Sequence, residues 1–149
     1  MGFMDIDLRA RAKEVLAQTH VMTLAVHDEA GVWAADVIFV YDDELRLYWI
    51  SDPDTRHSRA IEADGEAAAT ITASTKSKEP DFGLQLAGKV QRLSGPRPEP
   101  MAKHFGKRGR SLPEESENPF EGLAWYEFES HTIHLIDEAN FGFGAQNVP

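Results

Sequence analysis

The chain has 149 residues, of which 42 % are hydrophobic and 27 % charged; this is typical of a globular domain and argues against a disordered chain. Its formal net charge of −10 argues against a DNA- or RNA-binding function, because nucleic-acid-binding proteins need an excess of Lys and Arg to displace counterions. The absence of cysteine excludes disulfide bonds, thiolate nucleophiles and cysteine-ligated zinc.

The first residues, "MGFMDIDLRARAKEV", lack the apolar centre of a signal peptide, and no apolar run in the chain is long enough to span a bilayer. The sequence shows no internal repeat and no interdomain linker. We therefore expect a single domain over residues 1–149, located in the cytoplasm and without membrane contact.

The segment "DIDLRARAKEVLAQTH" predicts an N-terminal helix within residues 1–19. It places apolar residues such as Val15 and Leu16 among charged ones and contains neither Gly nor Pro, and Asp5 or Asp7 can cap its start.

The pattern changes to the alternation of strands in residues 20–51. Three runs of apolar, β-branched and aromatic residues are separated by turns at Asp28–Gly31 and Asp42–Glu44, which predicts an antiparallel meander. The later elements are expected to be a helix within 52–65 closed by Gly65, strands over 67–75 and 82–95 with a bulge at Gly88, a helix over 99–109 and two short strands meeting near Ser130. Residues 138–149 are expected to be a C-terminal tail, flexible over 142–147 and held by two aromatic anchors.

These elements predict a mainly β fold, a six- to seven-stranded antiparallel barrel with flanking helices. Closing the sheet would remove its exposed edges. A doubly wound α/β fold is disfavoured, because the first three strands lack the helices that parallel crossovers require.

The segment "YWISDPDTRHSRAI", residues 48–61, joins a strand to a helix in a way that suits an anion. A strand ending at Ser51 and a helix starting around Pro53 or Asp54 would direct free backbone N–H groups and the positive end of a helix dipole at one point.

The side chains of this segment fit the same chemistry. Arg56 can donate two parallel hydrogen bonds to a phosphate, His57 can donate one, and the hydroxyls of Ser51 and Thr55 complete the cradle. The neighbouring carboxylates oppose an anion unless they turn away as caps. The alternative is an ordinary capped helix with a solvated basic first turn.

Other motifs predict no catalytic or metal site. His131 and His134 are spaced as i, i+3 in an expected strand, so they point to opposite faces. The sequence has no G-x-S-x-G nucleophile motif, and the G-x-G at residues 142–144 has no helix after it to bind a dinucleotide. The basic run Lys103–Arg110 is expected to be a solvated face, with attraction of an anionic ligand as the alternative.

The order of these segments resembles the FMN-binding split barrels related to pyridoxamine 5′-phosphate oxidase. "YWISDPDTRHSRAIEADGEAAATI" is followed by "GLQLAGKVQRLSG", and the similarity runs from about Val15 to Gly144. It is greatest to a small bacterial branch with a Thr-Arg-His triplet in the phosphate turn and a C-terminal Gly-Phe-Gly, here residues 55–57 and 142–144.

The resemblance implies that Ser51, Thr55, Arg56 and His57 hold the FMN phosphate, with Ile50 lining the approach. The usual Arg-Lys pair of the family is replaced by Arg-His. Because imidazole titrates near pH ~6.5, phosphate affinity is expected to weaken at alkaline pH.

Further contacts to the flavin are implied on two strands. The main chain of Val37, Ile38 and Phe39 would lie against the isoalloxazine ring, and the amide of Gln85 would reach its polar edge, unless Gln85 only faces solvent. The basic residues of the oxidase on the first of these strands are replaced here by Ala35 and Val40, which argues against pyridoxamine phosphate as the substrate.

Split barrels of this family are dimers, so the resemblance implies two flavins at a subunit interface. Trp125, Phe141 and Phe143 would then cover the flavin of the partner subunit, or simply pack in the core or the dimer interface.

The expected function is therefore that of an FMN-dependent oxidoreductase acting on a small molecule, with no catalytic protein residue and no metal. FAD or a deazaflavin could occupy the same site. The alternatives from other classes are a non-catalytic flavin- or haem-binding protein and an interaction domain with an empty barrel.

Overall fold

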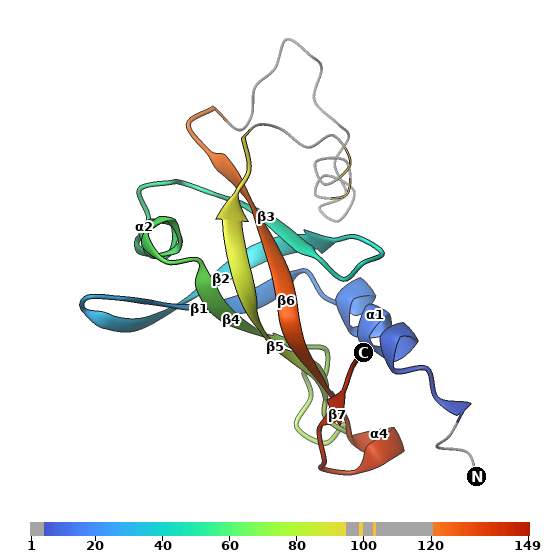
Figure 1. Ribbon diagram of the computed structural model, residues 1–149. Coiled ribbons are helices and arrows are strands. Elements are labelled where there is room, and N and C mark those ends of the chain that lie inside the picture. Colours follow the sequence, from blue (N-terminus) through green and yellow to red (C-terminus); the bar gives the residue numbers. More distant parts are fainter. Residues whose placement is uncertain (1–4, 95–98, 100–102, 104–120) are drawn as a thin grey trace.

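A computed structural model describes residues 5–94, 99, 103 and 121–149, and its strands form one antiparallel sheet that closes on itself (Figure 1). The strand order is β3-β2-β1-β4-β5-β6-β7, and β3 also pairs with β6. The elements are α1 (Leu8–Gln18), β1 (Val21–Asp28), β2 (Gly31–Tyr41), β3 (Leu47–Ser51), α2 (Arg56–Ala63), β4 (Glu66–Thr72), β5 (Phe82–Arg92), β6 (Ala124–Asp137), α4 (Glu138–Phe141) and β7 (Gln146–Asn147). The predicted six- to seven-stranded split barrel is confirmed.

The N-terminal helix and the meander are confirmed as well. Asp7 is the cap of α1, and its carboxylate accepts a hydrogen bond from the N–H of Ala10 at 3.1 Å. The β1–β2 turn ends at Gly31. Its φ of +120° is a backbone conformation that residues with a side chain adopt only with strain. Strand β1 alternates exposed and buried residues as the sequence predicts, whereas the first three residues of β3, Leu47–Trp49, are all buried.

The barrel interior is a single cluster of apolar side chains, closed by the two longer helices. Its largest fully buried members are four aromatic residues from three strands, namely Phe39 of β2, Trp49 of β3, and Tyr126 and Phe128 of β6. Val15 and Leu16 of α1 and Ile61 of α2 join the same cluster. Trp49 and Tyr126 are opposite each other in register and stack with 5.8 Å between ring centroids.

Two boundaries differ from the sequence predictions. The second helix begins at Arg56, after its cap Thr55, and not around Pro53 or Asp54, because residues 52–55 form a turn held by the Asp52 side chain and carbonyl. The predicted pair of strands near Ser130 is one continuous strand, β6, which pairs with both β3 and β5.

The predicted bulge lies at the expected place but on the other strand. Ala87 is opposite Thr132 and Gly88 is opposite Ser130, so His131 is the extra residue. At this point the backbones approach closely, and a Cβ on Gly88 would lie 2.1 Å from the carbonyl oxygen of Glu129.

We therefore expect Gly88→Ala to destabilise the protein by about 1–3 kcal/mol, since the ladder between β5 and β6 must shift to admit a methyl group. Urea unfolding measures the effect. Gly31 offers space for a Cβ but an unfavourable φ, so it is not a neutral control; Ala87→Ser, on the adjacent residue, is expected to cost far less. Equal stabilities of the two variants would contradict the close approach.

The predicted flexible tail over 142–147 is wrong for residues 146–147, which form a strand. The tail forms α4 and β7, and β7 pairs with β6 through Leu135 opposite Gln146. The N–H of Val148 donates to the carbonyl of Ile133 at 2.9 Å, and the side chain of Val148 is buried. Phe141 packs against the core, so hydrophobic contact holds the segment in place.

The predicted helix at 99–109 and most of the basic run Lys103–Arg110 lie outside the described residues. Among the described helices, none is both long enough and apolar enough to cross a bilayer.

Candidate functional site

The turn between β3 and α2 brings three of the predicted phosphate-binding side chains together. The Nε2 atom of His57 lies 2.9 Å from the Ser51 hydroxyl and 3.3 Å from the Thr55 hydroxyl. The Thr55 hydroxyl also accepts a hydrogen bond from the N–H of Ser58 as the helix cap. The β3 strand delivers Ser51 and the first turn of α2 delivers the other groups, so hydroxyl and imidazole groups meet where the helix has its free N–H groups.

The carboxylates in this turn have partners of their own. Oδ1 of Asp52 accepts a hydrogen bond from the N–H of Asp54 at 2.8 Å, which is the geometry of an Asx turn. Asp54 itself is 83 % exposed and lies 3.5 Å from the guanidinium of Arg59. Asp52 therefore stabilises the turn and Asp54 is a surface group paired with Arg59. Their repulsion of an anion at the turn is accordingly reduced.

Burial governs the charge of His57. The imidazole is half-buried, and its loss of solvent lowers the pKa of His57 below the usual value. His57 is therefore neutral at pH 7 in the free protein and acts as a hydrogen-bonding group rather than a fixed positive charge.

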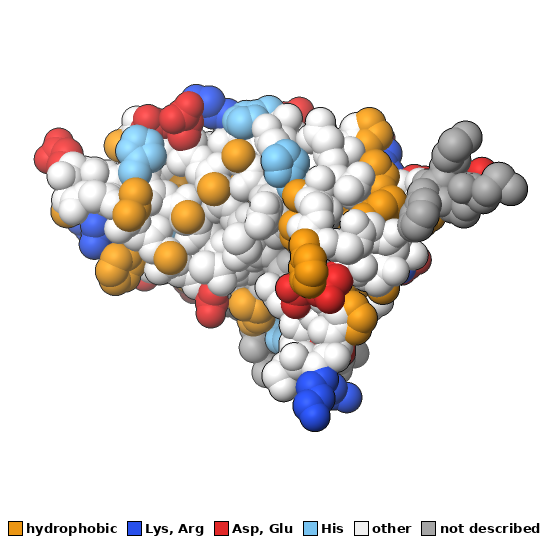
Figure 2. All heavy atoms as spheres, turned by 90° about the horizontal axis from the view of Figure 1, so that it is seen from below, with side chains coloured by type: hydrophobic (Ala, Val, Ile, Leu, Met, Phe, Trp, Pro, Cys, Tyr) orange, Lys and Arg blue, Asp and Glu red, His pale blue; other side chains and the backbone are white. Residues whose placement is uncertain are grey.

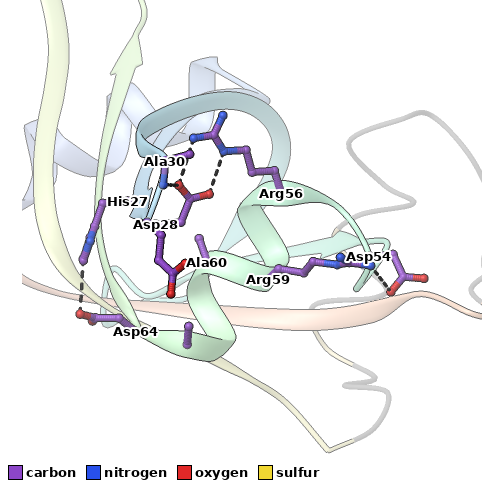
Figure 3. Close-up of a pocket in the computed structure, with 10 residues that line it drawn as sticks. His27, Asp28, Ala30, Asp54, Arg56, Arg59, Ala60 and Asp64 are labelled. Atoms are coloured by element: carbon purple, nitrogen blue, oxygen red, sulfur yellow. Dashed lines mark hydrogen bonds and ion pairs between the residues drawn. The ribbon is translucent and has the colours of Figure 1, made fainter.

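Arg56 lies apart from the three converging side chains, against the hairpin of β1 and β2. Its Nε and Nη2 atoms donate to the two carboxylate oxygens of Asp28 at 2.8 and 3.0 Å, a bidentate pair (Figure 3). Its guanidinium lies 4.6 Å from the ring centre of Trp33. The hydrogen bond from Arg56 is the main reason that the pKa of Asp28 is lowered.

Asp28 and Trp33 contact Arg56 but are not predicted by the sequence as parts of this site. Asp28 was assigned only to a turn, and no motif links it to a residue 28 positions later. The one signal in the sequence is a tryptophan directly after that turn. In the structure Trp33 is 45 % exposed, and large exposed aromatic side chains usually have a partner.

A cavity of about 800 Å³ lies between α2 and the end of the β1–β2 hairpin (Figure 3). Its lining contains four acids, two arginines and one histidine, namely Asp28, Glu29, Asp54, Asp64, Arg56, Arg59 and His27. The acid excess makes this cavity better suited to a cation than to a phosphate.

The remaining predicted residues are spread over two faces of the barrel. Gln85 is exposed on β5, between Thr70 of β4 and His134 of β6. Ile50 and Trp125 are opposite each other on β3 and β6 and belong to a second apolar cluster, in which Trp125 is 4 % exposed. Trp125 is thus packed within its own chain.

The strand β2 offers fewer free main-chain groups than expected. The N–H of Phe39 donates to the carbonyl of His20 on the β1 side, and by alternation Val37 is directed the same way. Ile38 directs its N–H and C=O to the other edge, where the described part of β3 pairs only with residues 39–41.

The two aromatic residues of the C-terminal segment are placed differently. Phe141 ends α4 and packs against the core, whereas Phe143 is 89 % exposed after Gly142. Of the two, only Phe143 is available to a second chain.

A cluster that the sequence did not predict lies beside the cavity. His27, Asp64 and Glu66 place one potential ligand atom each within 4.8 Å of one another. The sequence predicts no metal, and the two histidines weighed as metal ligands, His131 and His134, do not belong to this cluster.

The comparisons with known proteins give the family. No family model matches the chain. Over 102 residues it is 31 % identical to the UPF0306 protein YhbP of Salmonella paratyphi A, an alignment covering 66 % of this chain and 69 % of that protein. The chain belongs to the UPF0306 family. A UPF0306 protein of Enterobacter sp. (strain 638) is 32 % identical over 94 residues, which is 62 % of this UPF0306 chain and 66 % of the relative.

Solved structures similar to this UPF0306 protein are split barrels. A pyridoxamine 5′-phosphate oxidase-like protein of Listeria innocua gives a TM-score of 0.67 at 13 % identity, covering 87 % of this chain and 98 % of that one. The haem storage protein HutZ of Vibrio cholerae gives 0.69 at 14 % identity, covering 87 % and 95 %. An FAD-binding protein of Mesorhizobium loti gives 0.60 at 13 % identity, covering 83 % and 88 %.

These identities are low, so the structural likeness establishes the fold alone. The resemblance to the pyridoxamine 5′-phosphate oxidase-like split barrels is confirmed. This fold group contains proteins that bind flavin and proteins that bind haem.

Proposed function

We propose that the chain binds FMN by its phosphate at the β3–α2 turn and acts as an FMN-dependent oxidoreductase on a small molecule. The observation that supports this most strongly is the convergence of Ser51, Thr55 and His57 on the N-terminus of α2 in a split barrel. Hydroxyl groups, an imidazole and free helix N–H groups are donors that match the oxygens of a phosphate.

The residues of the proposed site bind or orient the cofactor. Arg56 completes the phosphate site when its guanidinium is shared with, or released from, Asp28. Ile38 offers main-chain groups and Gln85 an amide to the polar edge of the ring, and Ile50 lines the approach. The flavin supplies the hydride or electron transfer, so the protein needs no acid, base or nucleophile of its own.

The same proposal includes a homodimer with the cofactor at the interface. The outward side of the sheet carries four alanines side by side on adjacent strands, Ala34, Ala25, Ala68 and Ala87. Figure 2 shows one face of the molecule on which small hydrophobic side chains are scattered and charged ones lie mostly at the margins. Small side chains allow a second backbone to approach closely, and Gln85 lies at the edge of this row. Phe143 remains the candidate for covering the flavin of the partner subunit.

The proposal is tested by the cofactor that copurifies with the protein. We expect the absorbance spectrum of a flavin with a band near ~450 nm and the mass of FMN, followed by flavin-dependent oxidation of NADH or NADPH. FAD or a deazaflavin of the same phosphate-turn chemistry would be recognised by mass. A protein that takes up no flavin would contradict the proposal.

Haem binding is the second candidate, because HutZ and a haem-binding protein of Mycobacterium smegmatis share the fold at TM-scores of 0.69 and 0.65. In that case the protein would serve in storage or sensing. A Soret band near ~400 nm in place of the flavin band would favour this candidate.

The pH dependence of FMN binding tests the role of His57. Burial lowers the pKa of His57 in the free protein, and a phosphate dianion beside the ring would favour the protonated form. The ratio of FMN affinities between the wild type and His57→Gln is therefore expected to grow as the pH falls from about 8 to about 6. The protonation of the FMN phosphate affects both affinities equally, so it cancels in this ratio.

Fluorescence titration at several pH values provides both affinities. His57→Lys, which restores the family's usual residue, is expected to bind FMN tightly up to about pH 8, because lysine titrates near ~10.4. A wild-type to His57→Gln ratio that does not change with pH would place His57 outside the phosphate site.

A further inference from the structure

We infer that His27, Asp64 and Glu66 form a binding site for one divalent transition-metal ion of the zinc type, at the edge of the cavity beside α2. This site is separate from the proposed phosphate turn, and it does not rest on the proposed flavin function.

Three elements bring the ligands together. His27 lies near the end of β1, Asp64 is the C-terminal cap of α2, and Glu66 begins β4. Ala25 of β1 is opposite Ala68 of β4, and continuing this register by two residues places His27 opposite Glu66 on the outward side. Asp64 joins them from the helix end, and Figure 3 shows His27 and Asp64 directed at each other.

The distance between His27 and Asp64 fits a tetrahedral ion. Nε2 of His27 lies 3.4 Å from Oδ2 of Asp64, and all three ligand atoms lie within 4.8 Å of one another. Metal–ligand bonds of about 2.0–2.1 Å in a tetrahedron separate the ligand atoms by about 3.3–3.4 Å. The His27 to Asp64 spacing already has this value, and rotation of the exposed Glu66 side chain brings its carboxylate closer.

The Asp64 carboxylate is oriented for this role by its own backbone. Its Oδ1 atom accepts a hydrogen bond from the N–H of Glu66 at 2.9 Å, which leaves Oδ2 turned to His27. A ligand whose second oxygen is held in this way loses little freedom when it binds a metal.

The charge around the cluster favours a cation. Of the cavity's two arginines, Arg56 is paired with Asp28 and Arg59 lies beside Asp54, so Glu29 and Asp64 leave a negative excess. Lys89 is opposite Glu66 on β5 and is the competing cation. Its ammonium is a single charge on a flexible side chain, which a divalent ion can displace.

The ligand types select the metal. An imidazole nitrogen with two carboxylate oxygens suits zinc, cobalt and nickel, whereas magnesium and calcium prefer oxygen ligands alone. Three protein ligands leave at least one position open, as in zinc sites that bind a water or a substrate. The adjacent cavity of about 800 Å³ gives room for such a ligand.

Titration of the full chain, free of any polyhistidine tag, with CoCl2 tests the site, because cobalt has visible d–d bands that report tetrahedral coordination. We expect one cobalt ion per chain, displaced by ZnCl2. His27→Ala is expected to weaken cobalt binding by at least about tenfold, and Glu66→Gln, at an exposed position, by a similar factor.

The matched control is His131→Ala, which removes another exposed histidine and is expected to leave cobalt binding unchanged. Circular dichroism shows that each variant is folded. The inference is overturned if the chain gives no tetrahedral cobalt spectrum, or if the folded Glu66→Gln and His27→Ala variants bind cobalt as the wild type does.

Discussion

Replacement of Arg11 by methionine is expected to lower the free energy of unfolding by about 3 kcal/mol, near the lower end of the range for breaking a buried ion pair. Nε of Arg11 on α1 donates to Oδ2 of Asp137 at 2.8 Å, and the Asp137 side chain is 1 % exposed. Methionine can still contact Phe82, whose ring centre lies 4.3 Å from the guanidinium. The change therefore removes mainly the charge, together with its pairs to Asp137 and to the exposed Glu14.

The loss is large because the aspartate stays behind. Burial alone would raise the pKa of Asp137, but hydrogen bonds from Arg11 and Asn140 outweigh it and hold the pKa below its usual value. Without Arg11 the carboxylate is buried with too few donors. A decrease of about 6–12 °C in the melting temperature corresponds to this free energy for a chain of this size.

The pH dependence follows from the sign of this pKa shift. A lowered pKa means that the pair stabilises the wild type fully above the usual aspartate value of ~3.9, and that this contribution is lost as the pH falls through the folded-state pKa. The difference in melting temperature between Arg11→Met and the wild type should therefore shrink from pH 7 towards pH ~3.

Two comparisons separate the buried pair from a general surface effect. Arg9→Met, on the same helix, removes only exposed hydrogen bonds and is expected to cost less than about 1 kcal/mol. Adding Asp137→Asn to Arg11→Met should restore part of the lost stability, because it removes the unpaired charge. A double variant less stable than Arg11→Met alone would contradict this explanation.

Replacement of Arg56 by methionine is expected to weaken FMN binding by about tenfold or more, since the variant loses a bidentate charge-assisted contact to the phosphate. In the structure without cofactor, the same guanidinium is bound by Asp28, which competes with the phosphate. Asp28→Asn should therefore strengthen FMN binding, because it removes a competing anion and leaves the guanidinium charged.

Arg59→Met is the matched control for this pair of variants. Arg59 lies on the same helix, but its side chain is 71 % exposed and 3.5 Å from Asp54, so its removal should change FMN affinity by less than about twofold. If the Arg56 and Arg59 variants lose FMN affinity equally, the loss comes from the general positive charge of the helix and not from a specific contact of Arg56.

The sequence was sufficient for the parts of the molecule that depend on local pattern. Alternation in residues 20–51 predicted the meander, because inward and outward residues of a half-buried strand differ in polarity. The Ser51, Thr55 and His57 grouping followed from a strand that leads directly into a helix.

The features that the sequence did not predict depend on pairings between residues far apart in the chain. The Asp28–Arg56 pair and the His27–Asp64–Glu66 cluster need the register of β1 with its neighbours, which single-sequence patterns do not contain. The ordered tail was missed because Val148 and Phe141 are held by β6 and the core, not by their own local propensity.

The turn at Ser51, Thr55, Arg56 and His57 is proposed to hold a flavin by its phosphate. The direct measurement is a fluorescence titration of the cofactor-free chain with FMN and, in parallel, with riboflavin, which has the same ring but no phosphate. We predict that FMN binds at least about tenfold more tightly than riboflavin, and that Arg56→Met removes most of this difference. Equal affinities for FMN and riboflavin in the wild type would contradict the phosphate site.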